Sequence, residues 1–271
     1  MDLLRAILLG ILQGATEFLP ISSSGHLVLV PWWLGWDEPP VVFDVVLHLG
    51  TLMAVLVYFW RDWLTLLQAG IRALRTRTTQ DPEARLLLLL IVGTIPAALA
   101  GALLEGFFES TFSDPPLVAV FLLVTAVVLI FSERHHSADR PLSDMNTRDA
   151  LTIGLAQAIA IFPGISRSGS TIAAGLWEDL SRPEAARFSF LLAAPVILGA
   201  GVKKGLDIVT GSLTIGHDMV TPMVAGFVAA AVVGFLAIWF FMRLVQRQRL
   251  YGFAVYCAAF GTLSLLVALI R

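Results

Sequence analysis

The stretch FLPISSSGH at residues 18–26 interrupts an apolar segment that runs from residue 3 to residue 33, and FPGISRSGS at residues 162–170 interrupts a second one from 150 to 176. Proline, glycine and serine in the middle of an apolar stretch stop a helix and leave backbone polar groups without helical partners. Each segment is therefore predicted to be broken in the middle, either as one long kinked helix or as a re-entrant pair of half-helices.

The rest of the chain is apolar enough to lie in a membrane. Hydrophobic residues make up 57% of the 271 positions and charged residues only 14%, whereas soluble domains carry about 25% charged residues. Charge-free runs near the roughly 20 residues that cross a bilayer must be helical, because lipid cannot satisfy backbone groups. The predicted fold is a single all-α integral membrane domain over residues 1–271. It combines two re-entrant broken helices with six full transmembrane helices at residues 43–60, 86–104, 117–133, 186–202, 220–242 and 252–270.

Two other classes of protein are excluded by composition. The net charge is −2 and the basic residues are scattered through short connections, so no nucleic acid partner is expected. Cys257 is the only cysteine and falls in a predicted span, which rules out a disulfide framework or a cysteine-ligated metal.

The arginines gather on one side of this predicted topology. If both broken segments are re-entrant, residues 61–85, 134–149, 176–187 and 243–251 share a side, which the positive-inside rule makes cytoplasmic. Both chain termini then face outward. These connections hold thirteen arginines, namely Arg61, Arg72, Arg75, Arg77, Arg85, Arg134, Arg140, Arg148, Arg182, Arg187, Arg243, Arg247 and Arg249.

The two broken segments are related by an internal repeat. A shift of 144 residues superimposes seven residues of the first segment on identical residues of the second. Each repeat, approximately residues 1–133 and 145–271, then holds one broken segment and three full spans. Because three is odd, the second copy enters from the opposite face, and such inverted repeats place their site where the broken segments meet. The matching positions are Gly10, Gln13, Phe18, Ile21, Ser22, Ser24 and Gly25, on Gly154, Gln157, Phe162, Ile165, Ser166, Ser168 and Gly169.

Glu17 is the first candidate for chemistry, because an ionisable group inside an apolar half-helix is expensive and is usually functional. Gln13 lies one turn earlier on the same helical face. A carboxylate and an amide on one face supply the oxygen ligands that a hard divalent cation prefers, so both residues are candidate metal ligands.

The residues that follow offer a nucleophile and a base. Ser22, Ser23 and Ser24 precede Gly25 and His26. Serines at a helix restart often serve only as caps, whereas a serine near a histidine can also be a nucleophile with its base. His26 titrates near neutrality and suits proton transfer.

The motif PGISRSGST at residues 163–171 indicates a phosphate site. A restarting half-helix offers free N–H groups and a positive dipole end, and Arg167 adds a planar fork of donors. An arginine at membrane depth needs an anionic partner, which Glu17 in a structural ion pair or a phosphate ligand could provide. The candidate phosphate-binding residues are Ser22, Ser24, Gly164, Ser166, Arg167, Ser168, Gly169 and Thr171. His48 lies inside a predicted span and could face the site, although packing is the favoured interpretation.

At this point QGATEFLPISSSGH, residues 13–26, resembles the (E/Q)xxxE segment of the bacterial undecaprenyl-diphosphate phosphatases, the bacitracin-resistance family. PGISRSGST fits that family's PGxSRSxxT motif at every fixed position, and FDVVLHLGTLMAVLVYFWR (43–61) and RFSFLLAAPVILG (187–199) also resemble it. The resemblance implies hydrolysis of undecaprenyl diphosphate, which recycles the lipid carrier for peptidoglycan synthesis. It also implies a divalent cation, Mg²⁺ or Ca²⁺, and a catalytic set of Glu17, Ser23, His26 and Arg167. Some family members have Glu in place of Gln13.

The expected partners are a polyprenyl diphosphate substrate and bilayer lipids, with a homodimer left open. The expected location is the bacterial plasma (inner) membrane, as a multi-pass protein whose site opens to the outer, periplasmic side. Either Ser23 attacks with His26 as base, or His26 or Glu17 activates a water. The alternative function is a transporter or flippase of a polyprenyl phosphate lipid, because inverted repeats with broken helices are a transporter device.

Overall fold

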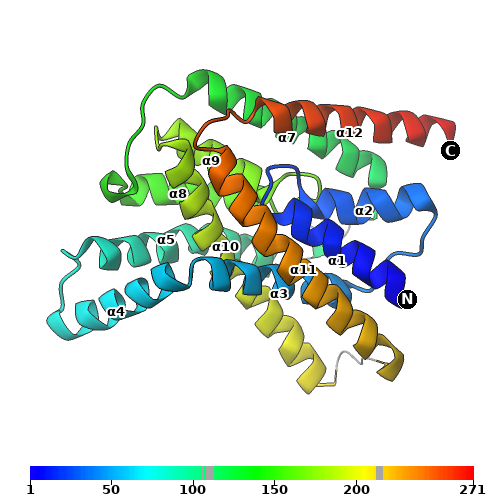
Figure 1. The fold of residues 1–271 in the computed structure, drawn as a ribbon, viewed down its shortest axis with the longest axis horizontal. Coiled ribbons are helices and arrows are strands. Elements are labelled where there is room, and N and C mark those ends of the chain that lie inside the picture. Colours follow the sequence, from blue (N-terminus) through cyan, green and yellow to red (C-terminus); the bar gives the residue numbers. More distant parts are fainter. Residues whose placement is uncertain (105, 108–110, 112, 212–215) are drawn as a thin grey trace.

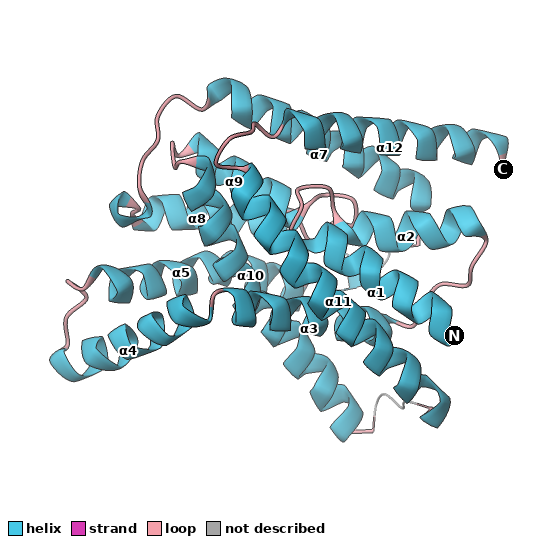
Figure 2. Ribbon diagram, in the orientation of Figure 1, coloured by secondary structure: helices cyan, strands magenta, loops and turns pink. Residues whose placement is uncertain are grey.

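The computed structural model describes residues 1–104, 106, 107, 111, 113–211 and 216–271, and this part of the chain is helical without a β-strand (Figure 2). The α-helices are α1 (Leu3–Glu17), α2 (Ser23–Leu34), α3 (Val41–Tyr58), α4 (Trp60–Thr76), α5 (Pro82–Leu103), α7 (Pro115–His135), α8 (Thr147–Ile159), α9 (Arg167–Trp177), α10 (Arg182–Val209), α11 (His217–Leu244) and α12 (Tyr251–Ile270). A short 3₁₀ helix, η1 (Leu142–Asp144), lies between α7 and α8.

Six of these helices are long and apolar enough to cross a membrane: α3, α5, α7, α10, α11 and α12. They fall on the six predicted spans, so within the described residues each predicted position holds a helix long and apolar enough to cross a membrane. In Figure 1 both termini lie at the right of the bundle, and the connection between α4 and α5 lies at the left.

Most of the connection predicted over residues 61–85 is the helix α4. Leu64, Leu67, Ile71 and Leu74 recur three or four residues apart and are all exposed, which is the pattern of an amphipathic helix. The sequence interpretation weighed the arginines of this segment and overlooked the apolar spacing between them.

Both predicted breaks are present. α1 ends at Glu17, and α2 begins at Ser23 after Ser22, which has a positive φ of 67°. α8 ends at Ile159, and α9 begins at Arg167 after a turn in which Gly164 has φ 95°. A Cβ at Gly164 would overlap the carbonyl oxygen of Val118, so both conformation and space demand glycine there.

The two half-helices that precede the breaks are held in the same way. α1 packs against α11 and α8 packs against α5. A Cβ on Gly10 would overlap the carbonyl oxygen of Gly226, and a Cβ on Gly154 would overlap that of Gly93. Two glycine–glycine crossings thus let each half-helix approach its partner closely enough to fix where the following break lies.

Candidate active site

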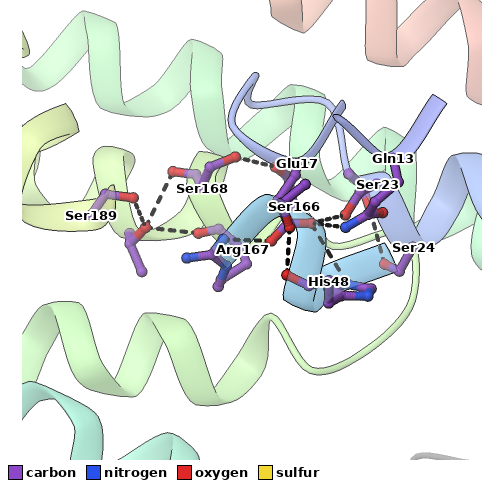
Figure 3. Close-up of polar contacts among 12 residues, drawn as sticks. Gln13, Glu17, Ser23, Ser24, His48, Ser166, Arg167, Ser168 and Ser189 are labelled. Carbon is purple, nitrogen blue, oxygen red and sulfur yellow. Dashed lines mark hydrogen bonds and ion pairs between the residues drawn. The ribbon is translucent and has the colours of Figure 1, made fainter. Parts of the chain in front are cut away.

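Glu17, at the last position of α1, is the centre of a buried ionic cluster (Figure 3). Its side chain is 4% exposed, and Arg167 Nη2 donates to its Oε1 over 2.6 Å. The two residues are 150 positions apart in sequence and come from the two different broken segments. The structure therefore brings the breaks together at this ion pair.

The second oxygen of Glu17 collects three further side chains. Gln13 Nε2 donates to Oε2 over 2.9 Å, and Ser23 Oγ donates to it over 2.5 Å. His48 Nε2 lies 3.6 Å from the same oxygen. The carboxylate is thus a shared acceptor at which an amide, a hydroxyl and an imidazole converge, as Figure 3 shows.

Two polar atoms of this cluster have no partner among the described residues. Arg167 Nη1 is a buried donor without an acceptor, and Gln13 Oε1 is a buried acceptor without a donor. Most buried polar atoms in proteins are hydrogen-bonded, because a buried polar atom without a hydrogen bond costs about 1–3 kcal/mol. One free donor and one free acceptor beside the same carboxylate suit a site that binds an anion and a cation together.

The half-helices α2 and α9 begin at this cluster with the same cap. Ser22 Oγ accepts from the amide of Gly25 over 3.2 Å, and Ser166 Oγ accepts from the amide of Gly169 over 3.0 Å. Such caps typically stabilise a helix by about 1 kcal/mol. Each first turn has two earlier backbone amides that bind no group of the described chain. They belong to Ser23 and Ser24 in α2 and to Arg167 and Ser168 in α9.

The other predicted phosphate-binding hydroxyls are occupied within the protein. Ser24 Oγ lies 3.2 Å from Ser22 Oγ, and Ser168 Oγ donates to the Leu19 carbonyl over 3.0 Å. Thr171 Oγ1 pairs with Ser189 Oγ at 2.6 Å. Of these three contacts, the bond from Ser168 to the Leu19 carbonyl joins the two breaks, and contact of the hydroxyls with phosphate stays a prediction.

His26 lies apart from Glu17 and Ser23 in the described contacts. Its Nδ1 bonds the Ser22 carbonyl oxygen at 2.7 Å, and its Nε2 lies 2.7 Å from the hydroxyl of Tyr256. Its ring stacks on Phe260 with a centroid separation of 4.6 Å. Because a carbonyl only accepts, Nδ1 carries the proton and Nε2 accepts from Tyr256. Both nitrogens are engaged, and the acid–base role of His26 stays a prediction.

The sequence left two interpretations of His48 open, packing or a position facing the site, and the structure supports the second, because the ring faces Glu17. A signal for it existed in the sequence. Asp44, His48 and Thr51 form a polar stripe at i, i+4 and i+7 along an otherwise apolar span, and this spacing marks one face of a helix.

Fold and site together define a polytopic helical membrane protein in which two broken segments join at a buried carboxylate–guanidinium pair. Residues 6–263 match the family model described as bacitracin resistance protein BacA, and the chain belongs to this family. The resemblance stated from its motifs is thereby confirmed.

Curated relatives match over nearly their whole length. Three proteins named undecaprenyl-diphosphatase illustrate the similarity. The one from Desulforudis audaxviator is 46% identical over 271 residues, covering 100% of both chains. That from Methanosphaera stadtmanae is 42% identical over 280 residues, covering 100% of this chain and 99% of the relative. That from Thermomicrobium roseum is 45% identical over 275 residues, covering 98% of each.

Proposed function

We propose that this protein hydrolyses undecaprenyl diphosphate to undecaprenyl phosphate and inorganic phosphate, which returns the lipid carrier to peptidoglycan synthesis. The observation that carries the proposal is the partly buried Arg167, which gives one nitrogen to Glu17 and keeps its buried Nη1 free of any partner in the described chain. A half-satisfied guanidinium at the start of a half-helix favours a phosphate oxygen as its remaining acceptor. The curated relatives' names agree with this activity.

The diphosphate has two phosphate groups, and the cluster has two helix starts to receive them. The first turns of α2 and of α9 both lie at the Glu17 cluster, since the side chains of Ser23 and Arg167 both contact Glu17. Arg167 Nη1 and the amides of these first turns would bind and orient the head group. The polyprenyl tail would lie along the apolar helix faces.

Ser23 is the favoured nucleophile. Its hydroxyl already donates to Glu17 Oε2, so the carboxylate can take the proton as the oxygen attacks the terminal phosphorus and undecaprenyl phosphate leaves. Water would then hydrolyse the phosphoserine. In the alternative mechanism, a water held by Glu17 or His26 attacks directly and the Ser23 hydroxyl forms no bond to phosphorus. The activity of Ser23→Ala distinguishes the two mechanisms.

A divalent cation, Mg²⁺ or Ca²⁺, forms part of the proposal. The donors fit a hard cation: Glu17 supplies a carboxylate, and Gln13 supplies an amide oxygen that has no partner among the described atoms. No group of three His, Cys, Asp or Glu side chains that could hold an ion occurs in the described residues, and substrate phosphates would contribute further oxygen ligands, as at many magnesium sites. When bound, the ion would neutralise diphosphate charge. Chelation by EDTA should abolish turnover, and Mg²⁺ or Ca²⁺ should restore it.

The protein is a multi-pass membrane protein, and we place it in the plasma membrane as an inverted repeat with α1–α2 and α8–α9 as re-entrant pairs. The matching crossings Gly10–Gly226 and Gly154–Gly93 support the repeat. The arginine-rich connections would face the cytoplasm. Both chain termini and the opening of the site would face the outside. A homodimer stays a prediction that the mass of the solubilised particle checks.

Cysteine labelling tests this topology. In a Cys257→Ser background, Asp37→Cys and Ser143→Cys each place a thiol at an exposed position in a connection. In intact cells a membrane-impermeant reagent should modify position 37 and spare position 143. The reverse result would invert the topology. Ser22→Cys should react from outside and be protected by substrate, and labelling of it only in inverted vesicles would move the opening to the cytoplasmic side.

Release of phosphate from purified protein in detergent tests the function itself. A phosphatase releases one phosphate per undecaprenyl diphosphate consumed. A lipid transporter, the alternative function, moves the lipid and releases none. If folded protein in the presence of Mg²⁺ or Ca²⁺ releases phosphate only at the background rate, the proposal is rejected.

A further inference from the structure

The proposed function gives no role to His48, the histidine that faces Glu17. Its Nδ1 bonds the backbone carbonyl oxygen of Asp44 at 2.7 Å. A carbonyl oxygen only accepts hydrogen bonds, so Nδ1 carries a hydrogen, and Nε2 is the ring nitrogen left to contact another group. Nε2 is turned toward Glu17 Oε2, at 3.6 Å, a distance too long for a hydrogen bond.

This orientation is the one that histidine ligands of metals adopt. A metal-bound imidazole almost always donates its other N–H to a backbone carbonyl, carboxylate or water, which fixes both tautomer and ring direction. The separation also fits. Two ligands that each lie about 2.1 Å from one small cation are roughly 3–3.5 Å apart, and the His48 Nε2–Glu17 Oε2 distance is 3.6 Å.

The other donors on this side of Glu17 support the same reading. Gln13 is fully buried, and its Oε1 has no partner among the described residues, while its Nε2 faces Glu17 Oε2. Rotation of the amide by half a turn would exchange the two atoms and present an oxygen to a cation at Oε2. Arg167 occupies the opposite oxygen, Oε1, so its charge is kept away from that side.

We propose that His48 Nε2 is a ligand of the divalent cation, together with Glu17 and Gln13. The inference rests on the proposed function only in assuming that Glu17 holds a cation. Three ligands of this kind form a mixed nitrogen–oxygen site. Mg²⁺ and Ca²⁺ prefer oxygen alone, whereas imidazole favours later first-row ions. The site should therefore bind Mn²⁺ or Co²⁺ more tightly than Mg²⁺.

The experiment detects the nitrogen directly. Purified protein in detergent is stripped with EDTA and loaded with substoichiometric Mn²⁺, and pulsed electron paramagnetic resonance is used to look for the ¹⁴N coupling of a bound imidazole. His48→Gln keeps a polar side chain but removes the ring. His135→Gln is the matched control, because His135 also bonds a backbone carbonyl through Nδ1, at 2.8 Å, but lies exposed at the end of α7.

Wild-type protein and His135→Gln should both show the coupling. His48→Gln should lose the nitrogen coupling and bind Mn²⁺ about ten-fold or more weakly than wild type. The affinity for Mg²⁺ should change by less than about three-fold between the two proteins. Bound Mn²⁺ without nitrogen coupling in the wild type, or coupling that survives in His48→Gln, would overturn the inference. Absence of Mn²⁺ binding to the wild type at millimolar concentration would overturn it too.

Phosphate release is measured on the same preparation, so that the two proposals fail separately. Protein that releases phosphate but shows no nitrogen coupling rejects the role of His48 alone. Protein that shows the coupling but releases no phosphate rejects the diphosphatase activity and leaves the metal site standing.

Discussion

The two broken segments share one frame and differ in their chemistry. In both, a serine caps the restarting half-helix, and the hydroxyls of Ser22 and Ser24 and of Ser166 and Ser168 lie 3.2 Å apart. At the positions that matter for the site, the copies diverge. Glu17 corresponds to Ile161 under the 144-residue shift, and Ser23 corresponds to Arg167.

Because of this difference, neither segment alone holds the whole cluster. The first segment supplies the carboxylate and the hydroxyl, and the second supplies the guanidinium. The shared serines and glycines hold the backbone, while the divergent residues meet at a single asymmetric cluster. If the account is right, substitutions at Glu17, Ser23 and Arg167 should change catalysis, and those at the matching serine and glycine positions should change mainly stability.

The largest loss is expected at Glu17. Glu17→Gln removes the charge that accepts from Ser23 and pairs with Arg167, so turnover should fall about 10⁴-fold. At the equivalent position of the second segment, Ile161→Leu should stay within about twofold of wild type, because it is a volume-conserving apolar exchange. Phosphate release measures both. Comparable losses at the two positions would remove the asymmetry.

Ser23→Ala should cost about 10³-fold or more, since loss of a covalent nucleophile leaves only the rest of the machinery. Rapid-quench analysis of the wild type with substrate labelled in the terminal phosphate should trap a phosphoserine. If Ser23→Ala keeps a tenth of wild-type turnover, a water attacks instead.

Arg167→Lys keeps the charge but loses the planar fork, and should lower kcat about 10²-fold. Arg182→Lys is the matched control, because Arg182 also forks onto a buried carboxylate, Glu133, at 3.0 and 2.6 Å, but lies outside the site. It should lower the thermal midpoint and leave kcat unchanged. A lowered midpoint with normal kcat in Arg167→Lys would make that pair structural.

The smallest effect compares the two buried glutamines. Gln13→Leu should lower turnover about ten-fold by weakening cation binding. Gln157→Leu should change turnover by less than about twofold and raise the thermal midpoint. Neither polar atom of Gln157 has a partner among the described residues, so an apolar side chain there removes an unsatisfied group. Equal losses of turnover would place both glutamines in the site.

Sequence patterns predicted the spans and the breaks well, and they predicted the contacts within the site less completely. Hydropathy located the six spans, and proline, glycine and serine inside apolar stretches located both breaks, because these features depend on local composition. The partners of His26 and His48 depend on how distant helices pack. Tyr256, which engages His26, is 230 positions away, and no local pattern reveals it. The only sequence signal that His48 faces inward was the polar stripe at Asp44, His48 and Thr51 along one face of the span.

The most direct test of the central claim, that the two segments form one catalytic unit, is a double-mutant cycle on phosphate release. Glu17→Asp and Arg167→Lys should each lower kcat about 10²-fold, because a shift of about 1 Å or loss of the fork suffices. Residues that act as a unit are strongly non-additive, so the double variant should also lie near 10²-fold. A double variant near 10⁴-fold would mean that Glu17 and Arg167 act independently and would contradict the account.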